Sequence, residues 1–112
     1  MESKRQQRIN KLLQKDLGEI FQMELKHLTQ NAMVTVTKVK VSPDLNSVKV
    51  YLSLFAAKNS EEMLKRIQRR SGEIRGRLGS RIRHQLRSVP ELHFYIDDSL
   101  DYIDHIEELL NE

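Results

Sequence analysis

The sequence predicts a single α+β domain in which helices cover one face of a three-stranded sheet. Long segments repeat hydrophobic residues at three- and four-residue steps, and short segments rich in β-branched residues interrupt them. The expected order is helix, strand, strand, two helices or one kinked helix, strand, helix, which is typical of an α+β fold. The chain has 112 residues. Because that length suits one core, we expect residues 1–112 to form one domain.

The first helix is expected over residues 4–28. Its apolar stripe consists of Ile9, Leu12, Leu13, Leu17, Ile20, Phe21 and Leu28. The first half of this helix carries Lys4, Arg5, Arg8, Lys11 and Lys15. Positive charge near a helix N-terminus opposes the helix dipole. These side chains are therefore expected to serve something other than helix stability.

Two strands are expected next, over residues 33–42 and 48–55, paired as an antiparallel hairpin around the turn at Pro43. The alternation changes phase within the first strand. In a regular strand, Val34 and Val36 would point to one face, and Val39 and Val41 to the other. A bulge near Thr37 and Lys38 would place all four valines on one face, and a sheet covered on both faces would also accommodate them.

The segment from Glu61 to Leu86 is expected to form two helices or one kinked helix, capped by Asn59 or Ser60. Its stripe is Leu64, Ile67, Ser71, Ile74, Leu78, Ile82 and Leu86. Glycines interrupt it, and we expect the break at Ser71-Gly72. Gly76 to Gly79 matches the Gly-x-x-Gly backbone clamp of KH domains. Leu78 belongs to the apolar stripe, which favours two tolerated glycines in a helix instead.

Pro90 ends the helical region, and a third strand follows in which Leu92, Phe94 and Ile96 alternate with polar residues. A closing helix is expected from about residue 99. Its apolar side consists of Leu100, Ile103, Ile106, Leu109 and Leu110.

Charge is segregated along the chain although the net charge is only +3. The basic segment contains Lys65, Arg66, Arg69, Arg70, Arg75, Arg77, Arg81, Arg83 and Arg87. Only Glu73 opposes it, whereas no Lys or Arg follows Arg87 and the closing helix is acidic. This asymmetry favours a polyanionic partner for the basic segment, with a merely solvated arginine-rich face as the alternative. The acidic helix could cover the core, or it could shield the basic surface.

Four motifs, in order, carry a resemblance to a known family. They are VTVTKVKVSPDL at 34–45 with VKVYLS at 48–53, SGEIR at 71–75 with LG at 78–79, VPELHF at 89–94, and Asp97 with Ser99. Over nearly the whole chain, the sequence resembles the ribosome-binding factor A family. The resemblance implies a type II KH-like fold, a cytoplasmic location, and binding to 16S rRNA in the free or immature small ribosomal subunit. It further implies a role in late 16S rRNA processing and in cold adaptation.

The sequence departs from the family pattern at two places. Arg70 stands first in Arg70-Ser71-Gly72, where the family usually has Ala-x-Gly, so the local RNA contact can differ. Residues 29–33 replace the Asp-Pro-Arg that usually precedes the first strand.

RNA contact is predicted for the basic segment, for the break within it and for the first helix. Arginines pair bidentately with phosphates, and a helix N-terminus after a glycine break offers free N–H groups to anions. The predicted RNA-binding residues are Arg5, Arg8, Lys11, Lys15, Arg66, Arg69, Arg70, Ser71, Gly72, Arg75, Arg77, Arg81, Arg83 and Arg87.

Enzymatic function is not expected. The chain lacks cysteine, which excludes disulfides and a cysteine nucleophile, and it has no P-loop or dinucleotide motif. The spacing of Asp101 and His105 is a weak metal signal, so no metal, cofactor or catalytic residue is predicted. Tyr51, Phe94 and Tyr95 are interpreted as packing residues.

We expect a monomer without a secretory signal or membrane span. The alternatives are a KH module for another RNA or for DNA, and a protein–protein adaptor with a basic face.

Overall fold

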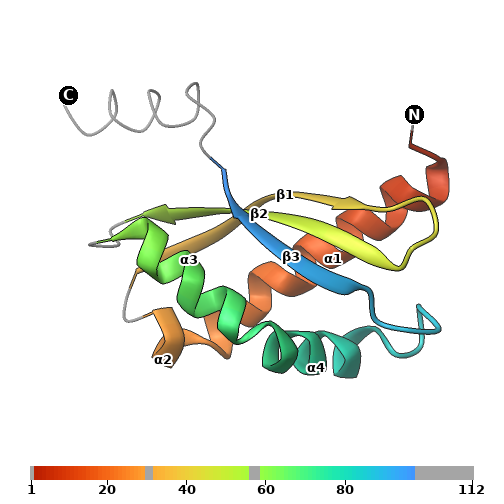
Figure 1. Cartoon of the computed structure of the whole chain (residues 1–112). Coiled ribbons are helices and arrows are strands. Elements are labelled where there is room, and N and C mark those ends of the chain that lie inside the picture. The colour runs from red at the N-terminus through yellow and green to blue at the C-terminus, as the bar shows by residue number, and fades with distance from the viewer. Residues whose placement is uncertain (1, 30–31, 56–58, 98–112) are drawn as a thin grey trace.

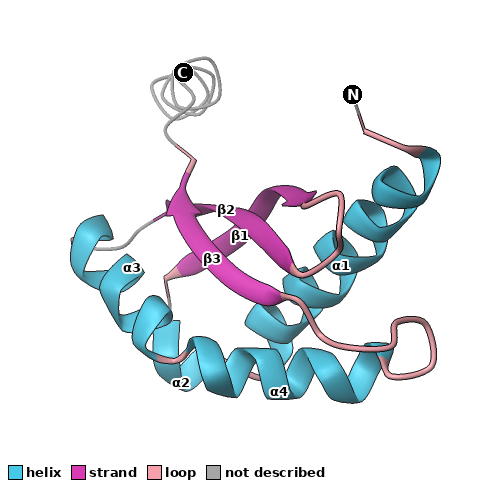
Figure 2. Ribbon diagram, turned by 45° about the vertical axis from the view of Figure 1, so that its right-hand side comes forward, coloured by secondary structure: helices cyan, strands magenta, loops and turns pink. Residues whose placement is uncertain are grey.

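A three-stranded sheet forms one layer of the protein and helices form the other (Figure 1). The computed structural model describes residues 2–29, 32–55 and 59–97. Its elements are α1 (Lys4–Met23), α2 (Lys26–Thr29), β1 (Met33–Val41), β2 (Ser47–Phe55), α3 (Ser60–Arg69), α4 (Ser71–Ile82) and β3 (Glu91–Ile96). Figure 2 shows these helices on the same side of the sheet, which confirms the predicted fold class. The expected closing helix lies outside the described residues.

The sheet has the order β1-β2-β3, with β1 and β2 antiparallel and β2 and β3 parallel. The predicted bulge is present, because the register shifts between Val36 and Lys38. As a result, all four valines of β1 turn to the helices and are buried. In the turn before β2, Leu45 adopts a left-handed conformation with φ of 62°.

Helix α1 begins with a capping box: the Ser3 hydroxyl accepts from the Gln6 N–H, and the Gln6 side chain accepts from the Ser3 N–H. It ends at Met23, five residues before the predicted boundary at residue 28. The N–H groups of Glu24 and Leu25 both donate to the Ile20 carbonyl, so the chain leaves the helix and buries Leu25 completely. The hydrophobic periodicity of the sequence did not indicate this turn, because leucines occur both before and after it. No helix within the described ranges, α1 included, is long and apolar enough to cross a bilayer.

Three side chains of α1, four residues apart, hydrogen-bond to the outer edge of β1. Gln6 Nε2 donates to the Val41 carbonyl (3.3 Å), Asn10 Oδ1 accepts from the Val41 N–H (2.8 Å), and Gln14 Nε2 donates to the Val36 carbonyl (3.2 Å). Exposed backbone groups at a sheet edge favour pairing with other chains. Helix α1 therefore protects one edge of the sheet, at β1.

Helices α3 and α4 meet at Arg70, one residue before the predicted break. Asn59 caps α3 as expected, its side-chain oxygen accepting from the Glu62 N–H at 3.1 Å. The difference at the break is small, because Ser71 and Gly72 form the first turn of α4 and Arg70 alone leaves the helical conformation. Leu78 is fully buried between two helical glycines, so Gly76 to Gly79 is a packed helix and not an exposed backbone clamp.

Candidate nucleic-acid interface

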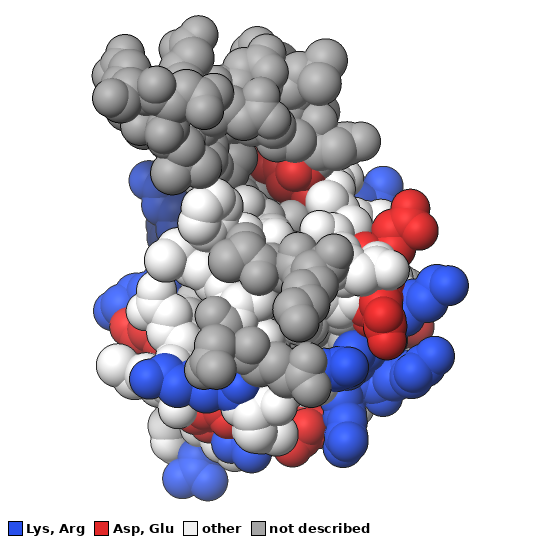
Figure 3. Space-filling view, turned by 90° about the vertical axis from the view of Figure 1, so that its left-hand side faces the viewer, with Lys and Arg blue, Asp and Glu red and all other residues white. Residues whose placement is uncertain are grey.

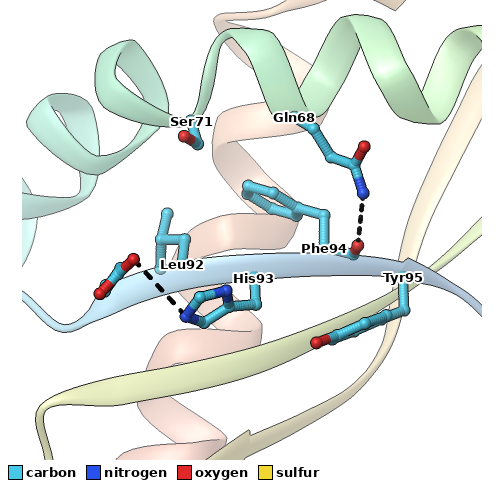
Figure 4. Close-up of a pocket in the computed structure, with 7 residues that line it drawn as sticks. Gln68, Ser71, Leu92, His93, Phe94 and Tyr95 are labelled. Carbon is cyan, nitrogen blue, oxygen red and sulfur yellow. Dashed lines mark hydrogen bonds and ion pairs between the residues drawn. The ribbon is translucent and has the colours of Figure 1, made fainter.

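A groove of about 300 Å³ lies between the α3–α4 break and strand β3. Its helical wall is formed by Gln68 and Ser71, and its other wall by residues 91–95 of β3. In Figure 4, Leu92 and Phe94 point from β3 toward the helices, whereas His93 and Tyr95 lie on the opposite side of the strand. The Gln68 amide donates to the Phe94 carbonyl (3.1 Å) and so ties the end of α3 to the strand.

Strand β3 is the second edge of the sheet, and in the described residues no further strand pairs with it. Its side chains alternate: Leu92 and Phe94 are buried against the helices, while His93 and Tyr95 are exposed. Backbone groups on the outer side of an edge strand are available to a ligand. Gln68 hydrogen-bonds to the edge of β3, whereas three side chains of α1 hydrogen-bond to the edge of β1. The edge of β3 is therefore less covered by side chains than the edge of β1.

Positive side chains gather where the two helices meet. Arg69 and Arg70 are exposed and Arg66 is half-buried. In Figure 3, which views the end of the molecule with α2 and α3, basic side chains gather along one side of the lower half. Arg66 and Arg69 lie in the last turn of α3, where the helix dipole also favours them. Arg70 is both the C-cap of α3, whose dipole favours a positive charge, and the N-cap of α4, whose dipole opposes one.

The N-terminus of α4 adds backbone donors at the same place. Its first turn has no side-chain cap, and nothing lies within 4 Å of the position that a Cβ of Gly72 would occupy. Uncapped N–H groups with nearby guanidinium groups form a binding site for a phosphate. Ser71, which lines the groove, joins this site to β3.

Arg75 is exposed but holds the chain that leads to β3. Its Nε and Nη2 atoms donate to the Val89 carbonyl at 3.2 and 2.7 Å. It therefore positions the segment before β3, and its charge remains close to solvent.

Arg77 and Arg81 bind carboxylates of α1 and of the turn after it. Arg77 Nη1 lies 3.0 Å from Glu24, and Arg81 contacts Glu24 (3.1 Å), Glu19 (2.5 Å) and Asp16 (3.5 Å). The hydrogen bond from Arg77, together with Arg81, lowers the pKa of Glu24, and the hydrogen bond to Glu19 raises the pKa of Arg81. These guanidinium groups therefore fasten α4 to α1 and to the turn after it.

A second basic region lies at the start of α1. Arg5 and Arg8 line a groove of about 390 Å³ with Ile9, Leu12, Gln85 and Leu86. The remaining predicted residues, Lys11, Lys15, Arg83 and Arg87, are exposed. The structure thus divides the predicted residues into three groups: those at the α3–α4 break, those on α1 and after α4, and the partly exposed ion-pair cluster that joins α4 to α1.

Sequence reasoning missed Gln68 and the edge of β3. No local signal marks them, since the order of strands in the sheet is what exposes this edge. It also missed the lysines at positions 38, 40 and 49, which are exposed on the strands. Their alternation with valines was the available signal. Within the described ranges no group of three His, Asp or Glu side chains could hold a metal ion, and the pair Asp101 and His105 lies outside them.

The sheet order, the parallel pairing of β3 and the broken helix pair between β2 and β3 define a KH-like domain, a class of nucleic-acid-binding fold. A family model described as Ribosome-binding factor A matches residues 5–110, so the chain belongs to this family. It is 45% identical to the ribosome-binding factor A of Christiangramia forsetii over 107 residues, covering 95% of this chain and 82% of that protein.

A crystal structure and a homology model of ribosome-binding factor A from Thermus thermophilus are similar to this chain. The crystal structure superposes with a TM-score of 0.68 at 23% identity, covering 81% of this chain and 94% of that one. The second was fitted into a cryo-electron microscopy map of a complex with the 30S subunit. It has a TM-score of 0.61 at 26% identity and covers 77% of this chain and 88% of that one.

Proposed function

We propose that this protein is an assembly factor of the small ribosomal subunit that binds 16S rRNA at the α3–α4 break and the adjoining edge of β3. The observation that carries the proposal is the convergence of Arg69, Arg70 and the uncapped α4 N-terminus beside an accessible strand edge. Family membership and the relative fitted into a 30S complex support the target.

The mechanism is binding without covalent chemistry. Guanidinium groups and α4 N–H groups hold backbone phosphates, while the groove at β3 accommodates an unpaired nucleotide next to them. Arg5 and Arg8 supply a second, separate contact to the same polyanion. Occupying a site on an immature subunit in this way requires neither a catalytic residue nor a cofactor. The family resemblance supports action in the cytoplasm, in late 16S rRNA processing and in cold adaptation.

The test is co-sedimentation of the full chain with purified small subunits, large subunits and assembled ribosomes. We expect selective pelleting with small subunits and loss of pelleting for Arg69→Glu/Arg70→Glu. The matched control is Gln22→Glu/Lys26→Glu/His27→Glu, because it changes the net charge equally at exposed residues outside both basic regions. Equal loss in both variants would show that net charge, and not the α3–α4 break, determines binding. Binding to every particle or to none would refute a small-subunit factor.

The salt dependence of binding to single-stranded 16S rRNA fragments tests the contact more finely. Each phosphate contact with a single strand contributes roughly 0.7 to the slope of log K against log salt. Removing two contacts with Arg69→Ala/Arg70→Ala should therefore reduce the slope by about 1.4. An adaptor that binds acidic proteins would ignore the RNA altogether.

A further inference from the structure

The sheet face that points away from the helices carries ordered rows of cationic and aromatic side chains. One row across the strands is Lys38, Tyr51 and Tyr95, and the next is Lys40, Lys49 and His93. We call the surface formed by these six residues, together with Met33 and Phe55, the open face, since no described helix covers it (Figure 2).

The open face contains a like-charge pair that is unfavourable for the isolated sheet. Lys40 lies directly opposite Lys49 on the antiparallel strands, and both are exposed. Like charges directly opposite each other destabilise a sheet. In the same region Lys38 Nζ lies 5.9 Å from the ring centre of Tyr51, while Glu91 approaches His93 at 3.8 Å. An anionic partner would convert the lysine repulsion into attraction.

The same face exposes apolar surface. Met33 is 62% exposed, Phe55 40% and Tyr95 42%, and Met33 stands opposite Phe55 at one end of the hairpin. The Tyr51 and Tyr95 rings are in contact, with their centres 5.6 Å apart. A partner that is only anionic would leave these side chains in water. A complementary partner is therefore both acidic and apolar.

The last described residue, Asp97, hydrogen-bonds to both other strands of the sheet. The Asp97 N–H donates to the Leu52 carbonyl of β2 (2.8 Å), and its carboxylate accepts from the Thr37 hydroxyl of β1 (2.5 Å). Asp97 thus reaches from the end of β3 across β2 to β1. In Figure 1 the described end of β3 rises on the side away from the helices.

We propose that residues 98–112 bind the open face as the acidic helix that their sequence predicts. Apolar side chains at 100, 103, 106 and 110 would contact Met33, Phe55 and the tyrosines, and acids at 101, 104, 107 and 108 would meet the lysines. About 15 helical residues span roughly 22 Å, which fits along strands of roughly 30 Å. Tethering at Asp97 makes the contact intramolecular and raises its effective concentration.

This arrangement places the acidic residues away from Arg69 and Arg70. It differs from the idea that the acidic helix shields the basic surface, because the acids would neutralise Lys40 and Lys49 instead. RNA is the competing occupant of the open face, and the experiment separates the two.

The test is paramagnetic relaxation in the full chain. Because the chain has no cysteine, His105→Cys creates one site for a nitroxide spin label, on the predicted polar side of the helix. We expect strong broadening of the Lys49, Tyr51 and Tyr95 amides and little at Ile74 in α4. Lys40→Glu/Lys49→Glu should abolish the broadening, whereas the matched reversal Lys11→Glu/Lys15→Glu on α1 should retain it.

Broadening centred on α3 and α4, or absent throughout, would overturn the proposal. A titration of the unlabelled full chain with a single-stranded 16S rRNA fragment is the second arm. If that RNA shifts the Tyr51 and Tyr95 resonances while the spin label leaves them sharp, the open face binds RNA and not the C-terminal segment. Neither result depends on whether the α3–α4 break binds RNA.

Discussion

Two glycines in one helix should respond to the same substitution with opposite sign. Gly76 and Gly79 both lie within α4. Nothing lies within 4 Å of a Cβ built on Gly76, whereas a Cβ on Gly79 would lie 2.9 Å from Cγ2 of Val89. Replacing an interior helical glycine by alanine stabilises a helix by roughly 0.5–1 kcal/mol. Gly76→Ala should show that gain in full.

Gly79→Ala should not show this gain and should instead destabilise the protein. Val89 is a short, stiff side chain whose backbone is held by Arg75, so it cannot move aside freely. Overpacking of this kind costs about 1–3 kcal/mol. Because both alanines share the same helix-propensity gain, we expect Gly79→Ala to be less stable than Gly76→Ala by about 1–3 kcal/mol.

Urea denaturation followed by circular dichroism measures the difference. A gain of about 0.7 kcal/mol with a slope near 1.5 kcal/mol/M raises the midpoint by about 0.5 M for Gly76→Ala. Val89→Ala should rescue Gly79→Ala in a double-mutant cycle. Equal stabilisation by both alanines would refute the close approach of Val89. Loss of RNA affinity in Gly76→Ala would instead indicate that Gly76 to Gly79 act as a backbone clamp for RNA.

Two further predictions concern polar contacts outside the interface. Glu24→Gln should cost about 1 kcal/mol at neutral pH, since the exposed side of the ion-pair cluster is screened by solvent. The arginines lower the pKa of Glu24 in the folded state, so its contribution is present above the unfolded value of 4.5 and is lost as the pH falls through the folded value. Urea midpoints of Glu24→Gln and the native chain should therefore converge at successively lower pH; a constant gap would contradict this. Asn59→Ala should cost about 1 kcal/mol by removing the α3 cap, and Asn59→Ser should restore most of it in the same assay.

Local pattern was enough to predict the hairpin and the burial of the β1 valines, and it offered the bulge as one of two explanations for their change of phase. The change of phase between Val36 and Val39 indicated either a bulge or a sheet covered on both faces. The register shift between Val36 and Lys38 shows that the bulge is the explanation. The end of a helix, in contrast, depended on contacts with residues that are distant in the sequence. Met23 ends α1 because Leu25 turns into the core, a tertiary preference that overrides helix propensity.

The candidate site was only partly predictable for the same reason. A run of arginines identifies a basic segment, but Arg70 and Arg81 look alike in the sequence. What separates them is the position of Glu19 and Glu24 on another element, which engage Arg81 and leave Arg70 exposed. The edge of β3 was not predictable without the strand order, since its exposure depends on which strand lies beside it.

The parallel placement of β3 also determines when the groove comes into existence during synthesis. One wall is built from α3 and α4, and the other from residues 91–95, which leave the ribosome much later than the hairpin. The β1–β2 hairpin can form locally, whereas β3 must wait for the intervening helices before it pairs with β2. A nascent chain that ends before residue 91 therefore carries the arginines but has no groove beside them. Binding that requires both walls would begin only after residues 91–95 have been synthesised.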